Sequence, residues 1–292
     1  MGPKWDRRFM NTPINRRTFL KVTGVAAAAG AAGILVAPRA TAVGPILGTV
    51  IDYAAGVPSA ASIKAAGHLG AVRYVSQRRP GTESWMLGKP VTLEETRSFA
   101  ALGLKTASVY QYGKGSTADW LNGAAGAGVH APQAIALHLA AGGPTNRPIY
   151  VAIDDNPTRT QYLNQIRPYL QAFKTALEAA GYRLGVYGNY NVIDWAISDG
   201  LGEFFWMHNW GGTGQVHPRA ALHQVRIDKD RLDGVGIDIN HVYAHDWGQW
   251  TPGNVVDDVV PPLPGSQEPL PHSALNPQSI SELMRVLGTL SS

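Results

Sequence analysis

The sequence predicts an α/β protein whose body is a single-domain (β/α)8 barrel of the TIM type. Eight short apolar runs recur along the chain, and most are almost continuously apolar, as strands covered on both faces are. Helical segments separate the early runs, and this alternation favours parallel strands joined by right-handed crossovers. An open doubly wound sheet is the alternative arrangement of the same elements.

The predicted strands cover 47–53, 71–76, 104–112, 148–154, 183–187, 204–209, 221–227 and 235–239. Helices are predicted over 59–66, 92–102, 131–141, 158–180 and 191–198. The second helix begins at Thr92, and Glu95 follows three residues later, which is the spacing of a capping box. The last two or three connections between strands contain little helical sequence.

Residues 1–42 have the order of an export signal: a basic segment, an Ala/Gly-rich apolar run and a small-residue cleavage motif ending at Ala42. The Arg16-Arg17 pair is typical of a twin-arginine signal. We therefore expect the twin-arginine translocase to export the folded protein to the periplasm, cell wall or extracellular space. After cleavage no stable membrane span is expected, and a retained N-terminal anchor is the alternative.

Residues 251–292 contain seven prolines, which is typical of an extended tail. Within the tail, apolar residues over 278–290 follow i, i+3, i+4, i+7 spacing and predict a short amphipathic helix. The barrel is therefore expected to span 43–250. We expect the tail helix to dock on the body, and contact with a partner or the envelope is the alternative.

The composition excludes several classes of function. The chain has no cysteine, which excludes disulfides, thiolate metal sites and cysteine nucleophiles. Beyond residue 42 it has 18 basic and 20 acidic residues, so its charge gives no reason to bind nucleic acid. Phosphate-loop, dinucleotide-binding and zinc-protease motifs are missing, and we expect no cofactor and no metal. A metal-dependent deacetylase or phosphodiesterase would need His208 and His223 near Asp154.

Polar residues end several predicted strands, which is where a β/α barrel carries its active site. Asp52, Asp154 and Asp238 end the first, fourth and eighth strands. Converging carboxylates raise one another's pKa, which yields a proton donor near neutral pH. Capping of the following helices by the individual aspartates is the structural alternative. Four further residues at these ends are candidates to position hydroxyl groups: Arg73, Gln111, Tyr112 and Gln224.

Side-chain alternation divides the segment that follows the fourth strand. If Asp154 faces the barrel axis, Asn156 shares its side, and Asp155 points toward the next helix or loop. We include Asp155 and Asn156 among the candidate binding residues. Aromatic residues near the same ends, Trp210 among them, fit a sugar site because pyranose C–H faces stack on such rings. Core packing of each ring is the alternative.

These strand-end segments resemble the glycoside-hydrolase-like family formerly called domain of unknown function 1906. The resemblance covers about 48–250 and is carried by 49–53 (TVIDY), 72–75 (VRYV), 110–113 (YQYG), 148–155 (PIYVAIDD), 222–225 (LHQV) and 236–240 (GIDIN). The chain more distantly resembles glycoside hydrolase family 25, the lysozyme-type muramidases, and this likeness also implies a β/α barrel.

The resemblance to the muramidases implies matching roles for Asp52, Asp154, Asp238 and Gln224. Asn156 stands where those enzymes have a glutamate proton donor, and an amide has no titrating proton. Two functions remain open. The first is an exported hydrolase of cell-envelope glycan, with peptidoglycan as the expected substrate, in which Asp154 and Asp238 act as acid and base and Asp52 tunes them. The second is a non-catalytic protein on the same barrel that binds glycan or remodels the cell wall.

Overall fold

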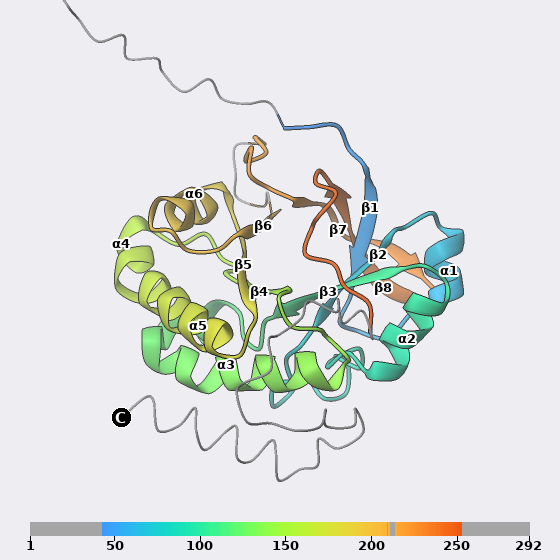
Figure 1. Ribbon diagram of the computed structural model, residues 1–292, viewed down its shortest axis with the longest axis horizontal. Helices are drawn as coiled ribbons and strands as arrows, with labels where there is room; N and C mark the ends of the chain where they lie inside the picture. The colour runs from blue at the N-terminus through green and yellow to red at the C-terminus, as the bar shows by residue number, and fades with distance from the viewer. Residues whose placement is uncertain (1–42, 209, 211–213, 253–292) are drawn as a thin grey trace, which may run out of the picture. The chain divides into compact units, whose positions relative to one another are not determined.

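The computed structural model describes residues 43–208, 210 and 214–252. These residues form one closed barrel of eight strands that follow one another in chain order around the ring (Figure 1). The predicted barrel is therefore confirmed, and the alternative open sheet is wrong. The predicted leader at 1–42 and the predicted tail helix at 278–290 lie outside the described residues.

The first six strands are short and mostly buried, as the apolar runs predict, whereas the last two are longer and mostly half-buried or exposed. They are β1 (Gly48–Asp52), β2 (Gly70–Tyr74), β3 (Lys105–Tyr110), β4 (Pro148–Ala152), β5 (Arg183–Gly188), β6 (Phe204–His208), β7 (Leu222–Leu232) and β8 (Val235–Val242). The largest departure from the predicted bounds is β7, which continues to Leu232 instead of ending at 227.

Helices lie outside the barrel between successive strands from β1 to β6 (Figure 1). They are α1 (Ala60–Ala65), α2 (Leu93–Ala101), η1 (Gly115–Thr117), η2 (Asp119–Asn122), α3 (Gly123–Ala140), α4 (Arg159–Gln161), η3 (Tyr162–Ile166), α5 (Arg167–Ala179) and α6 (Tyr190–Ser198). The Thr92 hydroxyl accepts the backbone N–H of Glu95 at 3.2 Å, so the predicted start of α2 is confirmed. No helix within the described ranges is long and apolar enough to cross a membrane.

Two helices differ from their predicted extent. Helix α3 begins at Gly123 rather than at 131, because small residues in its first turns allow close packing. A Cβ on Gly126 would lie 2.8 Å from the carbonyl oxygen of Asp119. The single helix predicted over 158–180 is divided by the π-helical turn η3. Pro168 follows this turn and cannot donate the N–H bond that a continuous α-helix requires.

Strand β8 runs in the opposite direction to the rest of the barrel. It pairs antiparallel with both β7 and β1, whereas the strands from β1 to β7 pair in parallel. A parallel connection needs a crossover of about a dozen residues, but only Asp233 and Gly234 separate β7 from β8. Both have positive φ, as a tight hairpin turn requires. Strand β7 pairs with β6 only as far as Gln224, but it pairs with β8 as far as Leu232. The β7–β8 hairpin therefore extends beyond the rest of the barrel.

The barrel interior is a packed core. Apolar side chains from all eight strands meet inside it, among them Val50, Val72, Val109, Tyr150, Tyr187, Trp206, Leu222 and Val242. A second apolar layer joins the outer faces of β3 to β6 to helices α3, α5 and α6. Since side chains fill the interior, space for a ligand has to lie at the mouth of the barrel.

Candidate active site

A cavity of about 550 Å³ opens at the end of the barrel where strands β1 to β6 finish. Seven of the ten candidate site residues predicted from the sequence line this cavity: Asp52, Gln111, Tyr112, Asp154, Trp210, Gln224 and Asp238. The structure therefore gathers residues from the beginning, middle and end of the barrel sequence in one hollow. Arg73, Asp155 and Asn156 do not line this cavity.

Asp52 and Asp238 lie next to each other on neighbouring strands. They are Cα partners in the β1–β8 pairing, so their side chains share a face of the sheet at the same level. The prediction that Asp238 ends its strand is wrong, because it is the fourth residue of the antiparallel strand β8. Cross-strand pairing with Asp52, and not a strand end, brings its carboxyl to the mouth of the barrel.

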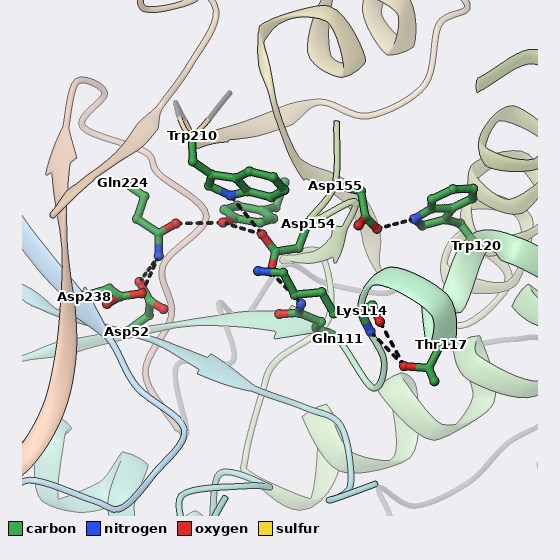
Figure 2. Close-up of polar contacts among 11 residues, drawn as sticks. Asp52, Gln111, Lys114, Thr117, Trp120, Asp154, Asp155, Trp210, Gln224 and Asp238 are labelled. Atoms are coloured by element: carbon green, nitrogen blue, oxygen red, sulfur yellow. Dashed lines mark hydrogen bonds and ion pairs between the residues drawn. The ribbon is translucent and has the colours of Figure 1, made fainter. Parts of the chain in front are cut away.

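The amide of Gln224 connects this pair to the centre of the site (Figure 2). Its Nε2 donates to Asp52 Oδ2 at 3.2 Å and to Asp238 Oδ2 at 2.9 Å. Its Oε1 accepts the hydroxyl proton of Tyr187 at 2.7 Å. Both amide protons and the amide oxygen are used, and this fixes the orientation of Gln224 between the carboxyls.

Asp52 is held deep in the wall of the cavity, with 3% of its surface exposed. Burial raises the pKa of its carboxyl well above the usual value, and the adjacent charge of Asp238 raises it further. Asn240 Nδ2 donates to Asp52 Oδ2 at 2.7 Å, and Trp206 Nε1 donates to Asn240 Oδ1 at 2.7 Å. These bonds hold Asp52 in place and oppose part of the increase in its pKa.

Asp238 is half-buried and opens onto the cavity. Burial raises the pKa of its carboxyl to about 6. The backbone N–H of Asp228 donates to Oδ1 at 2.8 Å and opposes part of this increase. The charges of Asp228 and Asp154 act in the same direction as burial. Since Asp52 and Asp238 interact strongly, the two carboxyls titrate as a pair. One proton is thus available near neutral pH at a position that a ligand reaches.

Asp154 follows β4 and lies in a set of donors on the other side of Gln224 (Figure 2). The ammonium of Lys114 lies 2.8 Å from Oδ2, and Gln111 Nε2 donates to the same oxygen at 3.0 Å. Trp210 Nε1 donates to Oδ1 at 3.2 Å. The Tyr187 hydroxyl lies 3.4 Å from Oδ1, but its single proton goes to the closer acceptor on Gln224. The donors around Asp154 match an ionised carboxylate.

Arg73 is fully buried, and its guanidinium is occupied inside the protein. Nε donates to Glu95 Oε1 at 2.5 Å, and the two terminal nitrogens donate at 2.6 Å to the carbonyl oxygens of Tyr53 and Gly88. The prediction that Arg73 positions a substrate hydroxyl is therefore not supported by its location. Its contacts instead hold the segments after β1 and β2 against helix α2.

Asp155 points away from Asp154, as side-chain alternation predicts (Figure 2). Its carboxylate accepts Trp120 Nε1 at 3.1 Å. Asn156 does not share the cavity side, because its side chain is exposed and its Oδ1 accepts Asn189 Nδ2 at 2.9 Å. Neither residue reaches the cavity, so the expectation that both bind substrate is not supported by the geometry.

The alternative that required a metal depends on two histidines. His208 is buried and stacks under Trp210, with ring centroids 4.5 Å apart, and burial lowers its pKa to about 4. His223 precedes Gln224 in β7, so its side chain points to the opposite face of the sheet. Within the part of the chain that the structure describes, no group of three or more His, Asp or Glu is arranged to hold a metal.

Several cavity residues were not predicted as site residues from the sequence. They are Tyr74, Arg79, Lys89, Lys114, Tyr187 and Asp228, among others. Tyr187 stands near the end of a predicted strand, and the strand-end criterion applied to it would have found it. Lys114 lies in the loop after β3, and its reach back to Asp154 depends on the course of that loop through η1.

A closed β/α barrel whose mouth holds paired carboxyls, a hydrogen-bonded glutamine and exposed aromatic rings defines a glycoside-hydrolase-like protein. The family model described as "Rv2525c-like, glycoside hydrolase-like domain" matches residues 61–242, and the chain belongs to this family. The model of the twin-arginine translocation signal matches residues 13–33. The predicted signal is thereby confirmed, and the protein is exported to the periplasm, cell wall or extracellular space.

Relatives from Mycobacterium tuberculosis cover most of the chain. A protein named "Putative peptidoglycan hydrolase Rv2525c" is 52% identical over 242 residues, which are 81% of this chain and 99% of that protein. The crystal structure of the Tat-secreted protein Rv2525c with L-tartrate matches with a TM-score of 0.67 and 55% identity, over 70% of this chain and 100% of the other. A second crystal form with HEPES matches with a TM-score of 0.66 and 54% identity, over 70% and 99% of the two chains.

Proposed function

We propose that this exported protein hydrolyses glycosidic bonds in a cell-envelope glycan, and that the glycan is peptidoglycan, as the name of its mycobacterial relative suggests. The observation that carries the proposal is the pairing of two different carboxyls at one cavity. Asp238 has a pKa raised to about 6, and Asp154 is held by a lysine ammonium at 2.8 Å. Carboxyl groups in unequal environments are the acid and base arrangement of glycoside hydrolysis.

In this mechanism Asp238 is the proton donor. It gives its proton to the glycosidic oxygen as the C–O bond breaks, and the leaving sugar departs as an alcohol. The Asp154 carboxylate stabilises the positive charge that develops on the sugar ring. Water then adds its hydroxyl to the sugar and gives its proton to the Asp238 carboxylate, which restores the acid. Asp52 titrates together with Asp238, while Gln224 donates to both carboxyls and fixes the distance between them.

Other cavity residues are proposed to position the sugar. The amide oxygen of Gln111 accepts a sugar hydroxyl on one side of the site, and the second lone pair of Gln224 Oε1 accepts another. The rings of Tyr112 and Trp210 line the cavity and offer faces for pyranose stacking. Trp85 lies at the rim with 51% of its surface exposed, and it extends this platform outward.

A second candidate is a non-catalytic glycan-binding protein on the same barrel. It is favoured by the acids of the site: among the described residues, those that line the cavity include aspartates but no glutamate. In that case the carboxyls of Asp52, Asp154 and Asp238 would serve as acceptors for sugar hydroxyls. The two candidates share the ligand and differ in whether a bond breaks.

Release of reducing ends from purified peptidoglycan by the exported protein tests the proposal. The parent is compared with Asp154→Asn and Asp238→Asn, and each change is expected to reduce the rate by about 10²–10⁴-fold, the usual contribution of an acid or base. Asp155→Asn is the matched control, because it makes the same substitution one residue along, where the side chain contacts Trp120 outside the cavity. It is expected to retain the rate of the parent.

Binding separates the two candidates. If the parent releases no reducing ends but sediments with peptidoglycan, and Asp154→Asn weakens this binding, the non-catalytic function replaces the hydrolase. If neither cleavage nor binding is found, both candidates fail. Release by the parent that survives both site substitutions would show that the cavity carboxyls are not the acid and base.

A further inference from the structure

The charges around the cavity are arranged in two arcs. Following the barrel order, Asp228, Asp238 and Asp52 come from neighbouring strands β7, β8 and β1. The next two connections around the ring, those after β2 and β3, contribute the cations Arg79, Lys89 and Lys114. Asp154 of the β4 end then faces Lys114. A ligand in this cavity therefore has one acidic and one basic flank.

Lys89 is a buried ammonium in the basic arc. It is 4% exposed and lines the cavity, and its Nζ donates to the carbonyl oxygen of Gln111 at 2.9 Å. The same nitrogen lies 4.0 Å from the centre of the Tyr74 ring. An ammonium has three protons, and one carbonyl and one ring face leave part of its hydrogen-bonding capacity unused. Burial lowers its pKa to about 8, as expected for a cation without an anionic partner.

Arg79 lies on the same side and has no carboxylate partner among the described residues. It is half-buried, and its guanidinium contacts the hydroxyl of Thr117. The other buried or cavity-lining cations differ, since Arg73 pairs with Glu95 at 2.5 Å and Lys114 pairs with Asp154 at 2.8 Å. The charge of Arg79 also lowers the pKa of Lys89, so the two cations lie close enough to repel each other.

Asp119 is the carboxylate whose charge raises the pKa of Lys89 most, but it forms no ion pair with Lys89. Its two oxygens accept the backbone N–H groups of Tyr112 at 2.8 Å and Gly113 at 2.7 Å. It is 5% exposed and does not line the cavity, and burial raises its pKa to about 6. Among the described residues, no carboxylate that lines the cavity forms an ion pair with Arg79 or Lys89.

We propose that Arg79 and Lys89 form an anion subsite that binds a carboxylate carried on a sugar, so that the preferred ligand is an acidic saccharide. This inference rests on the proposed glycan function and adds to it the charge of the preferred glycan and the orientation in which the glycan binds. Guanidinium and ammonium groups bind carboxylates by charge-assisted hydrogen bonds, and the repulsion between two unpaired cations is relieved when an anion binds. Asp228 and the remaining negative charge of the Asp52–Asp238 pair repel the same anion, so the saccharide enters with its carboxylate toward the β2 and β3 side.

The test compares equilibrium binding of a matched pair of probes at pH 7 by titration calorimetry. One probe is a tetrasaccharide of N-acetylglucosamine and N-acetylmuramic acid, and the other is its methyl ester, which has the same rings without the charge. The parent is expected to bind the acid at least about tenfold more tightly, the effect of one charge-assisted hydrogen bond. A tetrasaccharide of glucuronic acid and N-acetylglucosamine shows whether a carboxylate on the ring replaces one on an ether side chain.

Arg79→Gln and Lys89→Met are expected to remove the preference for the acid while retaining the affinity for the ester. Arg78→Gln is the matched control, because Arg78 is exposed, donates to the carbonyl oxygen of Glu83 and does not line the cavity. Lys89 is buried, so its substitution could impair folding. Arg79 is only half-buried, and Arg79→Gln still tests the subsite in that case.

Each result separates the subsite from the glycan function. Equal affinity of the parent for acid and ester overturns the anion subsite and leaves the glycan site standing. Loss of both affinities in Arg79→Gln also overturns it, since the residue then acts on the whole site. If the parent binds no saccharide but binds malonate, and Arg79→Gln removes this binding, the anion subsite stands and the glycan function fails.

Discussion

Replacing Asp238 by asparagine changes the pH dependence of stability as well as activity. The pKa of this carboxyl is about 6 in the folded protein and 3.8 in an unperturbed chain, mainly because of burial. Since the folded value is the higher one, the folded state keeps a proton that the unfolded state releases between about pH 4 and 6. The free energy of unfolding of the parent therefore falls as pH rises through this window, and Asp238→Asn lacks this part of the fall.

The size of the effect follows from the position of the side chain. A change from 3.8 to about 6 corresponds to about 3 kcal/mol for a group shielded from water. Asp238 opens onto the cavity, so screening by solvent reduces this to roughly 1–2 kcal/mol. The asparagine amide keeps an acceptor for only one of two donors, Gln224 Nε2 and the N–H of Asp228, which costs about 1 kcal/mol at every pH.

Urea unfolding followed by tryptophan fluorescence between pH 4 and 7.5 measures this difference. We expect Asp238→Asn to be about 1 kcal/mol less stable than the parent at pH 4 and roughly equal or slightly more stable at pH 7.5. Asp194→Asn makes the same substitution on a carboxylate that is 60% exposed, and it serves as the control. A difference between parent and Asp238→Asn that stays constant over this range would refute the reasoning, because Asp238 would then titrate alike in both states.

Three further predictions follow from the same contacts. Reducing-end release is expected to fall as pH rises above about 6, because Asp238 then loses the proton it donates; rates measured from pH 4 to 8 check this, and a constant rate contradicts it. Arg73→Met is expected to lower the free energy of unfolding by about 3–5 kcal/mol, because the Glu95 carboxylate stays buried without its partner. Urea denaturation measures this, and reduced glycan affinity at unchanged stability would return Arg73 to substrate binding. Trp210→Ala is expected to weaken glycan binding about tenfold through loss of a stacking face, and unchanged affinity in calorimetry would exclude that role.

The sequence predicted the barrel because its evidence is local. The apolar runs and the helical segments between them indicate which segments are strands. Eight strands that alternate with helices favour closure into a (β/α)8 barrel. The direction of β8 was not inferred, although its signal is also local. The predicted strands 221–227 and 235–239 are separated only by 228–234, which is too short for a crossover, and Asp233-Gly234 is a dipeptide typical of a hairpin turn.

The strand-end criterion predicts the level of a residue in the barrel but not the face to which it points. Asp52 faces the cavity, and its Cα partner on β2 is Val72, so Val72 and Tyr74 point inward and Arg73 points outward. The strand register therefore places Arg73 on the face away from the cavity. This register depends on how the strands pair, and the pairing cannot be inferred from the sequence alone. Lys114 was missed for a related reason, since its position depends on the path of a loop.

The substitution at Asn156 bears on catalysis differently once its position is known. Its side chain is exposed and bonded to Asn189, while the neighbouring Asp155 is held by Trp120 on the side away from the cavity. A glutamate at 156 on this backbone would point to the same exposed region, so the asparagine does not by itself remove an acid from the cavity. A proton donor for the proposed hydrolysis therefore has to come from another strand. Asp238 meets both requirements, because its pKa is raised to about 6 and it opens onto the cavity that Asp154 shares.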